Sequence, residues 1–142
     1  MNRLLIILLL LAIPLLAYGC WRSLEPTIGT AVTAAEAPIS GLPESATDVR
    51  YFLAGAFGPS TYYEFQVSEA EFEAWTGRMK FDFTRDGSGK FYALKEDGRP
   101  HRAVEIEDGI ILWWRDPNNS DSGVAAAYDR STGRAYYHMH TR

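Results

Sequence analysis

The first twenty residues differ sharply from the rest of this chain, and they constrain its fold more than any other feature. The run Leu4–Ala17 is entirely apolar, and Arg3 with the amino terminus gives it a short positive flank. A helix of this length spans about 21 Å, less than the roughly 30 Å hydrocarbon core of a bilayer. We therefore expect 1–19 to be a secretory signal peptide. Extending the apolar stretch to Trp21 leaves an uncleaved membrane anchor as the alternative.

Cys20, the only cysteine in the sequence, directly follows the small residue Gly19. A lone thiol has no disulfide partner in the chain, so the exported domain must fold without covalent cross-links. The segment Leu16-Ala17-Tyr18-Gly19-Cys20 resembles the lipobox of bacterial lipoproteins. This resemblance implies cleavage after Gly19, lipid on Cys20, and anchoring to the cell membrane or outer membrane.

One alternative localisation stays open. Ala17 and Gly19 also satisfy the small-residue rule for cleavage of an ordinary secreted protein. Both interpretations cut the chain at the same bond and differ only in the lipid. A soluble secreted or periplasmic protein is therefore the second expectation.

The charge of the mature chain excludes one class of partner. The whole sequence has a net charge of −4, which becomes more negative when Arg3 is removed. An acidic domain is repelled by phosphates, so no nucleic-acid partner is expected. The sequence contains no phosphate-binding glycine loop and no Gly-x-Ser-x-Gly elbow, so we predict neither a cofactor nor a catalytic nucleophile.

Composition divides the exported chain into two parts. The stretch 20–41 is rich in Thr, Ala, Ser and Pro and shows no sustained helical or strand period. It predicts a flexible tether behind the anchor cysteine. The remaining stretch, 42–142, is long enough for a single small domain.

The clearest local signal in this domain is a helix start. Ser68-Glu69-Ala70-Glu71 fits a capping box, in which Ser68 and Glu71 satisfy the first backbone N–H groups. Phe72, Trp75 and Met79 then recur at helical spacing. The pattern predicts a helix over about 69–77 that docks on a sheet through its aromatic side chains.

Alternating apolar residues and turn residues predict strands in the rest of the domain. They lie at 49–53, 62–67, 81–83, 91–94, 104–106, 110–114, 124–128 and 134–141. A hairpin is expected around Asp86–Gly89 and a second one around Asp129–Gly133. The predicted fold is α+β: an antiparallel sheet of about six strands with one main helix packed on one face.

Adjacent aromatic pairs recur along the predicted strands. They are Tyr51-Phe52, Tyr62-Tyr63, Phe91-Tyr92, Trp113-Trp114 and Tyr136-Tyr137. Neighbours in a strand point to opposite faces, whereas one helix covers only one face. The hypothesis is that the other face presents Tyr62, Trp113, Trp114 and Tyr136 to a protein or envelope ligand. The alternative is that these rings are good strand formers covered by loops or by the tether.

Two histidines near the end of the chain are weak metal candidates. His138 and His140 are two residues apart on a predicted strand, so their side chains share a face at roughly 7 Å. A metal site needs further ligands, for which His101 and Asp129 are available. The leading interpretation is a non-catalytic envelope lipoprotein that binds or organises a partner. The alternative is a secreted or membrane-tethered enzyme, metal-dependent or hydrolase-like.

Overall fold

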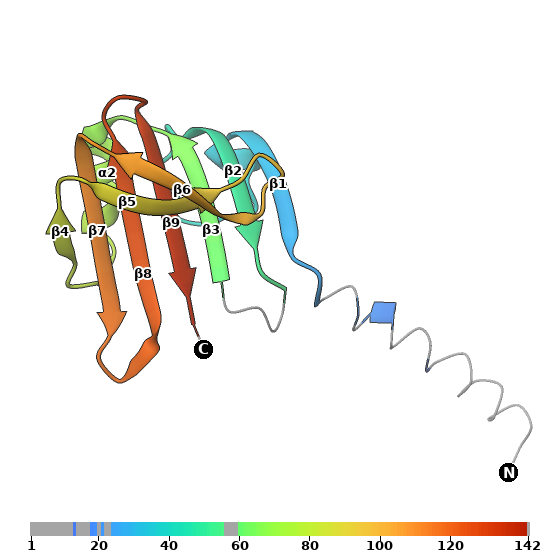
Figure 1. The fold of residues 1–142 in the computed structure, drawn as a ribbon. Helices are drawn as coiled ribbons and strands as arrows, with labels where there is room; N and C mark the ends of the chain where they lie inside the picture. Colours follow the sequence, from blue (N-terminus) through green and yellow to red (C-terminus); the bar gives the residue numbers. More distant parts are fainter. Residues whose placement is uncertain (1–12, 14–17, 20, 22–23, 56–59, 142) are drawn as a thin grey trace, which may run out of the picture.

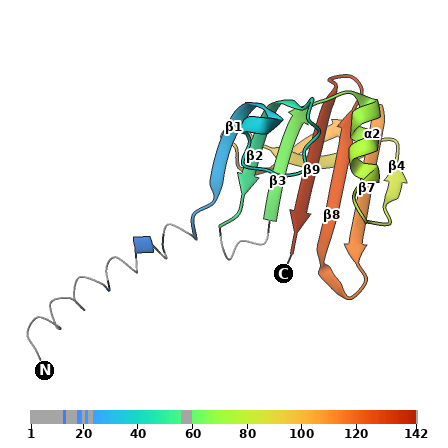
Figure 2. The ribbon, with the colours of Figure 1, turned by 180° about the vertical axis from the view of Figure 1, so that it is seen from behind.

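The computed structural model describes residues 13, 18–19, 21, 24–55 and 60–141, and their main element is one antiparallel sheet. In spatial order the sheet contains β1 (Thr27–Thr33), β2 (Thr47–Leu53), β3 (Ser60–Gln66), β9 (Arg134–His140), β8 (Asn119–Asp129), β7 (Gly109–Asp116) and β4 (Thr84–Asp86). A ribbon of β5 (Gly89–Leu94) and β6 (Pro100–Ile106) crosses one face (Figure 1). The helix α2 (Glu69–Gly77) lies on the opposite face, and the 3₁₀-helix η1 (Ala34–Glu36) follows β1 (Figure 2).

This arrangement confirms the predicted α+β fold, with an antiparallel sheet and a helix packed on one face. The main sheet has seven strands rather than about six, and the ribbon adds a third layer. The helix has the predicted bounds because its start is encoded locally: the Ser68 side chain accepts a hydrogen bond from the Glu71 backbone N–H.

The core has two parts, one on each face of the sheet. On the helix face, Phe72 and Trp75 of α2 are buried against Phe65 and Tyr137 of the sheet. On the ribbon face, a smaller cluster is formed by Phe91, Ala93, Ile106, Ile111, Ala127 and Tyr136. The ribbon therefore buries apolar sheet residues that a two-layer fold would leave exposed.

The prediction of a flexible tether over 20–41 is wrong from Thr27 onward. Thr27–Thr33 form β1, which pairs antiparallel with β2 in a register without a shift. Ala31 and Ile39 pack against the core of the helix face. Small and β-branched residues without an alternating pattern form this strand because β2 supplies backbone partners along most of its length.

The hairpin predicted around Asp86–Gly89 is also wrong, whereas the terminal hairpin of β8 and β9 is present. β4 pairs with β7 in the main sheet, and β5 pairs with β6 in the ribbon. The turn residues at 86–89 thus carry the chain from one layer to the next. Phe81, predicted in a strand, lies in a loop and packs on Trp114 with ring centroids 4.8 Å apart.

Cys20 lies outside the described residues, as does most of the apolar run before it. Signal cleavage after Gly19 and lipid attachment therefore stay predictions. Among the residues that the structure describes, no helix is long and apolar enough to cross a membrane.

Candidate functional site

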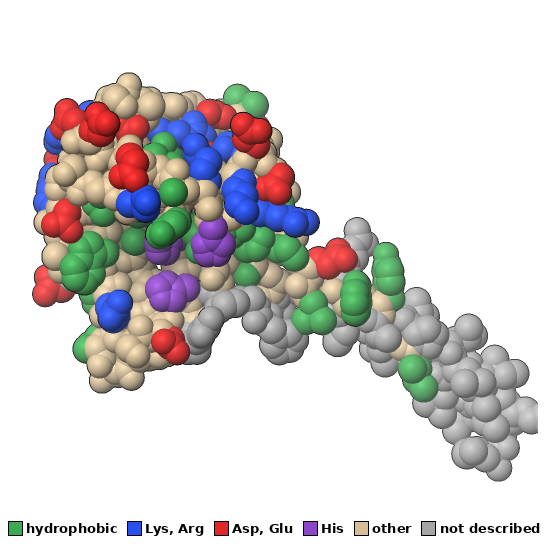
Figure 3. Space-filling model, in the orientation of Figure 1, with side chains coloured by type: hydrophobic (Ala, Val, Ile, Leu, Met, Phe, Trp, Pro, Cys, Tyr) green, Lys and Arg blue, Asp and Glu red, His purple; other side chains and the backbone are tan. Residues whose placement is uncertain are grey.

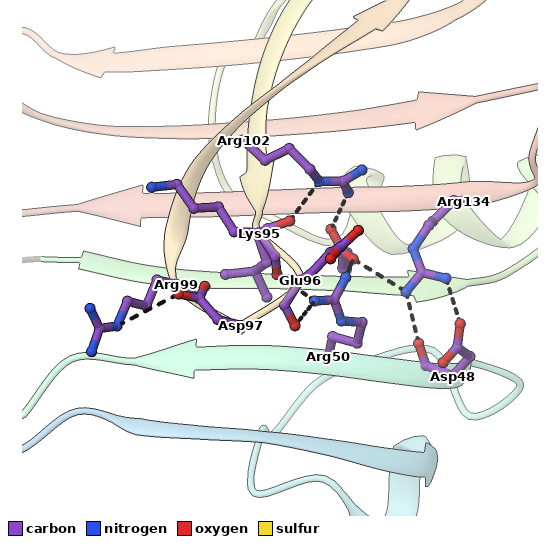
Figure 4. Close-up of polar contacts among 10 residues, drawn as sticks. Asp48, Arg50, Lys95, Glu96, Asp97, Arg99, Arg102 and Arg134 are labelled. Carbon is purple, nitrogen blue, oxygen red and sulfur yellow. Dashed lines mark hydrogen bonds and ion pairs between the residues drawn. The ribbon is translucent and has the colours of Figure 1, made fainter.

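The ribbon is fixed over the sheet by a buried carboxylate. Glu64 of β3 is almost fully buried, and Arg50 of β2 donates to it at 2.6 Å. Arg102 of β6 reaches the same carboxylate at 3.2 Å, and Arg134 of β9 at 3.4 Å. Figure 4 shows these three arginines converging from different strands. We call Glu64 with its three arginines the arginine cluster.

Two of these arginines also bind the turn of the ribbon. Arg50 donates to the backbone carbonyls of Lys95 and Glu96, and Arg102 donates to that of Leu94 at 2.6 Å (Figure 4). A buried carboxylate needs several donors to offset its desolvation, and here the donors come from both layers. The arginine cluster therefore sets where the ribbon crosses the sheet.

The three histidines of the chain gather on this side of the sheet, two of them from β9 and one from the ribbon. Tyr62 and His138 are direct cross-strand partners on β3 and β9, with ring centroids 5.3 Å apart. His140 follows on the same face, 6.2 Å from His138. His101 of the ribbon packs on Tyr62 at 5.9 Å. The histidine side chains are grouped on this face in Figure 3. We call Tyr62, His101, His138 and His140 the histidine site.

A backbone irregularity aims His101 into this site. Ala93 pairs with Arg102 and Leu94 with Pro100, so His101 is the extra residue of a β-bulge. Its φ of 78° lies in the left-handed region, which is uncommon for any residue other than glycine. Such a conformation costs on the order of 1 kcal/mol and occurs often at binding sites.

His138 is a neutral ring, and one of its two nitrogens has no hydrogen-bond partner. Its Nδ1 is buried and has no hydrogen-bond partner. Burial is the main cause that lowers the pKa of His138 to about 4, and His140 and His101 lower it further, while a hydrogen bond to the backbone of Tyr92 raises it. The ring is therefore uncharged at neutral pH. Because Nδ1 has no partner, we assign the bond to the backbone of Tyr92 to Nε2, which leaves Nδ1 with a lone pair that can accept a hydrogen bond.

A cavity of about 380 Å³ adjoins the histidine site. Its lining includes Tyr62 and His101 from the site, with Phe52, Pro100, Leu24 and Pro26 around them. Apolar walls with a few polar groups at one side are typical of small-molecule sites.

The four aromatic residues predicted to form one exposed surface do not do so. Tyr62 and Tyr136 are only 7% and 4% exposed, because the ribbon covers them. Trp114 lies on the opposite face, against Phe81. Trp113 is 45% exposed, and its indole N–H donates to Asp86 at 3.2 Å. That hypothesis is wrong because it assigned one covering element to the sheet, whereas there are two.

The structure brings some of the predicted metal-ligand candidates near one another and keeps Asp129 apart from them. His138 lies beside His140, and His138 and His101 each contact the Tyr62 ring. Asp129 instead accepts hydrogen bonds from Ser131 and Thr132 in the β8–β9 turn. Within the described part of the chain, no group of three or more His, Cys, Asp or Glu side chains is placed to hold a metal ion.

Comparison of the chain with protein-family models, with curated proteins and with solved structures found no match.

Proposed function

We propose that this protein is an exported, lipid-anchored binding module of the cell envelope, and that its ligand binds at the histidine site. One observation carries the proposal: the buried Nδ1 of His138 has no partner, and it lies in a ring cluster that borders a cavity. Buried polar atoms in folded proteins are nearly always satisfied. His138 itself does not line the cavity, so we infer that a ligand donor would have to reach this nitrogen between Tyr62 and His101, which do line it.

The surroundings of the cavity define the ligand class. Phe52, Tyr62 and Pro100 offer apolar and aromatic surface, which favours a flat apolar body. The neutral His138 ring accepts a hydrogen bond and carries no charge, so a neutral N–H or O–H donor suits it better than an ion. We infer a small aromatic or amphiphilic molecule with one donor group. The site has no nucleophile paired with a base, so binding rather than catalysis is proposed.

Indole and naphthalene test this proposal as probes. The two have similar shapes, and only indole has an N–H donor. Each is titrated into the purified full chain while the ¹⁵N chemical shift of His138 Nδ1 is followed by NMR. We expect the preference for indole over naphthalene to fall about five-fold in His138→Phe, since a net hydrogen bond contributes about 1 kcal/mol.

His138→Phe keeps a ring of similar shape in the cluster and removes only the acceptor. The matched control is Trp113→Phe, on the same face but outside the cavity lining. Failure of both probes to bind the wild-type chain would contradict the proposal, as would an indole preference that persists in His138→Phe.

The anchor belongs to the same proposal and has its own support. Thr27, where β1 begins, is only seven residues after Cys20. Seven extended residues span at most about 25 Å. With lipid on Cys20, the linker is therefore short, and the domain is held close to the membrane surface rather than on a long flexible tether.

The intact mass of the protein from a membrane fraction tests the anchor. We expect a chain that begins at Cys20 and carries acyl groups, and Cys20→Ser should lack them. A mass beginning at Cys20 without lipid would make the domain a free secreted protein and would leave the histidine site as a separate question.

A further inference from the structure

The two edges of the main sheet are protected very differently. β4 forms one edge and has only three residues, two of them charged; Arg85 is paired with Glu73 of α2 at 2.7 Å. β1 forms the other edge and has seven residues, none of them charged and none proline. Short, charged edges resist pairing with other chains, whereas long uncharged edges favour it. β1 is at the margin of the sheet in both ribbon views (Figures 1 and 2).

The backbone of β1 shows which residues face the free edge. The N–H of Val32 points away from β2, because it donates to the side chain of Glu36 at 3.2 Å. The register with β2 runs from Thr27 to Thr33 without a shift, so N–H directions alternate regularly. Ile28 and Thr30 therefore present their N–H and C=O groups to the same edge as Val32.

The side chains at this edge are apolar and exposed. Val32 is 71% exposed and Ile28 is 41% exposed. They lie on the same face of the strand, with Thr30 between them. An uncharged edge with two exposed β-branched residues is well suited to cross-strand pairing.

The sequence of β1 shows what fits beside it. Around Thr30 the strand is nearly symmetric: Gly29 matches Ala31, Ile28 matches Val32, and Thr27 matches Thr33. An antiparallel pair of identical strands related by a two-fold axis places each residue opposite its symmetry mate. We propose that β1 is a homodimer interface, in which two copies pair antiparallel with the axis at Thr30.

In this pair, Ile28 of each copy lies opposite Val32 of the other, and the two Thr30 residues exchange backbone hydrogen bonds. The N–H of Val32 exchanges the Glu36 carboxylate for the Ile28 carbonyl of the second copy. Two seven-stranded sheets then become one continuous sheet. The proposal does not depend on the histidine site or on the lipid.

Cysteine cross-linking tests the interface and its register. A hydrogen-bonded antiparallel pair has Cα atoms about 5.5 Å apart, within the range of a disulfide. Thr30→Cys should therefore form a disulfide-linked homodimer in the full chain under mild oxidation. Val32→Cys alone should not, because the two Val32 residues are separated by four residue positions, roughly 13 Å along the strand. All variants carry Cys20→Ser, so that only the introduced thiol reacts.

A mixture of Ile28→Cys and Val32→Cys chains should cross-link only as a heterodimer, which confirms the axis independently. Thermal unfolding of the reduced variants checks that each one folds. The proposal is overturned if correctly folded Thr30→Cys stays monomeric, or if Val32→Cys alone cross-links as efficiently. A disulfide between Thr30→Cys and a different protein would also overturn it, since the edge would then take another chain.

Discussion

Arg102 on the ribbon and Glu64 on the main sheet form an ion pair at 3.2 Å that joins two separate sheets. Arg50 and Arg134 share the same carboxylate, so one buried negative charge holds three positive charges in place. The crossing of the ribbon thus depends on a single acidic residue.

Glu64→Gln should destabilise the protein strongly. The substitution leaves three arginines around a neutral amide, and removing one member of a buried ion pair typically costs about 3–5 kcal/mol. Chemical denaturation measures the loss, and hydrogen exchange should show that β5 and β6 lose protection first.

Glu105→Gln is the matched control, because Glu105 pairs with Lys90 at 3.5 Å on the surface of the same ribbon. We expect that change to cost less than about 0.5 kcal/mol. Equal costs for the two substitutions would refute the role given to the arginine cluster.

The stability of the protein should fall as the pH falls, through His138. Its pKa is lowered from 6.5 to about 4 in the folded state, mainly by burial. Between these two values the unfolded chain binds a proton that the folded chain does not. The free energy of unfolding therefore falls by about 1.4 kcal/mol for each unit by which the pH is lowered. The stability linked to the neutral His138 ring is fully present above pH 6.5 and is lost as the pH falls toward 4.

Denaturation of wild type and His138→Phe across this range isolates the effect, because the carboxylates titrate in both proteins. His101 and His140, the titratable neighbours named beside the ring, are also present in both. The difference in stability between the two proteins should change by about 3 kcal/mol from pH 7 to pH 4 in the direction that disfavours wild type. Parallel curves would show that His138 is not buried as a neutral ring.

The elements that the sequence predicted correctly are those specified by local signals. Ser68 and Glu71 define the start of α2, and Gly133, with a φ of 65°, supports the turn between β8 and β9. β1 was missed because its residues show no alternation of apolar and polar side chains, although its partner β2 is the next strand in the chain. The ribbon strands β5 and β6 were predicted as strands, but their separation from the main sheet was not. Strand alternation at 91–94 predicted a strand but could not say which sheet it joins.

Among the residues of the candidate site, too, local sequence signals predicted some and missed others. His138 and His140 were singled out from their spacing, but the approach of His101 depends on a bulge in a separate ribbon. Glu64 was missed entirely, although an acid among the aromatic residues of β3 was a usable signal. Its partners Arg102 and Arg134 are 38 and 70 residues away, so no local pattern connects them.

The packing where the ribbon strand β6 leads into β7 can be tested by a glycine substitution. Gly109 begins β7, and a Cβ atom there would collide with the backbone carbonyl of Tyr128 and with the side chain of Ile106. Neither neighbour can move freely, since one is sheet backbone and the other is fully buried. Gly109→Ala should therefore cost at least about 2 kcal/mol.

Gly77, the last residue of α2, supplies the opposite case, because a Cβ atom there meets nothing within 4 Å. Gly77→Ala should stabilise the protein by about 0.5–1 kcal/mol through helix propensity and a less flexible unfolded chain. Gly→Ala should therefore lower the free energy of unfolding at Gly109 and raise it at Gly77, if Ile106 packs against Gly109 as described. Thermal unfolding of both variants decides the matter, since a harmless Gly109→Ala would mean that β6 and β7 are joined by a looser turn.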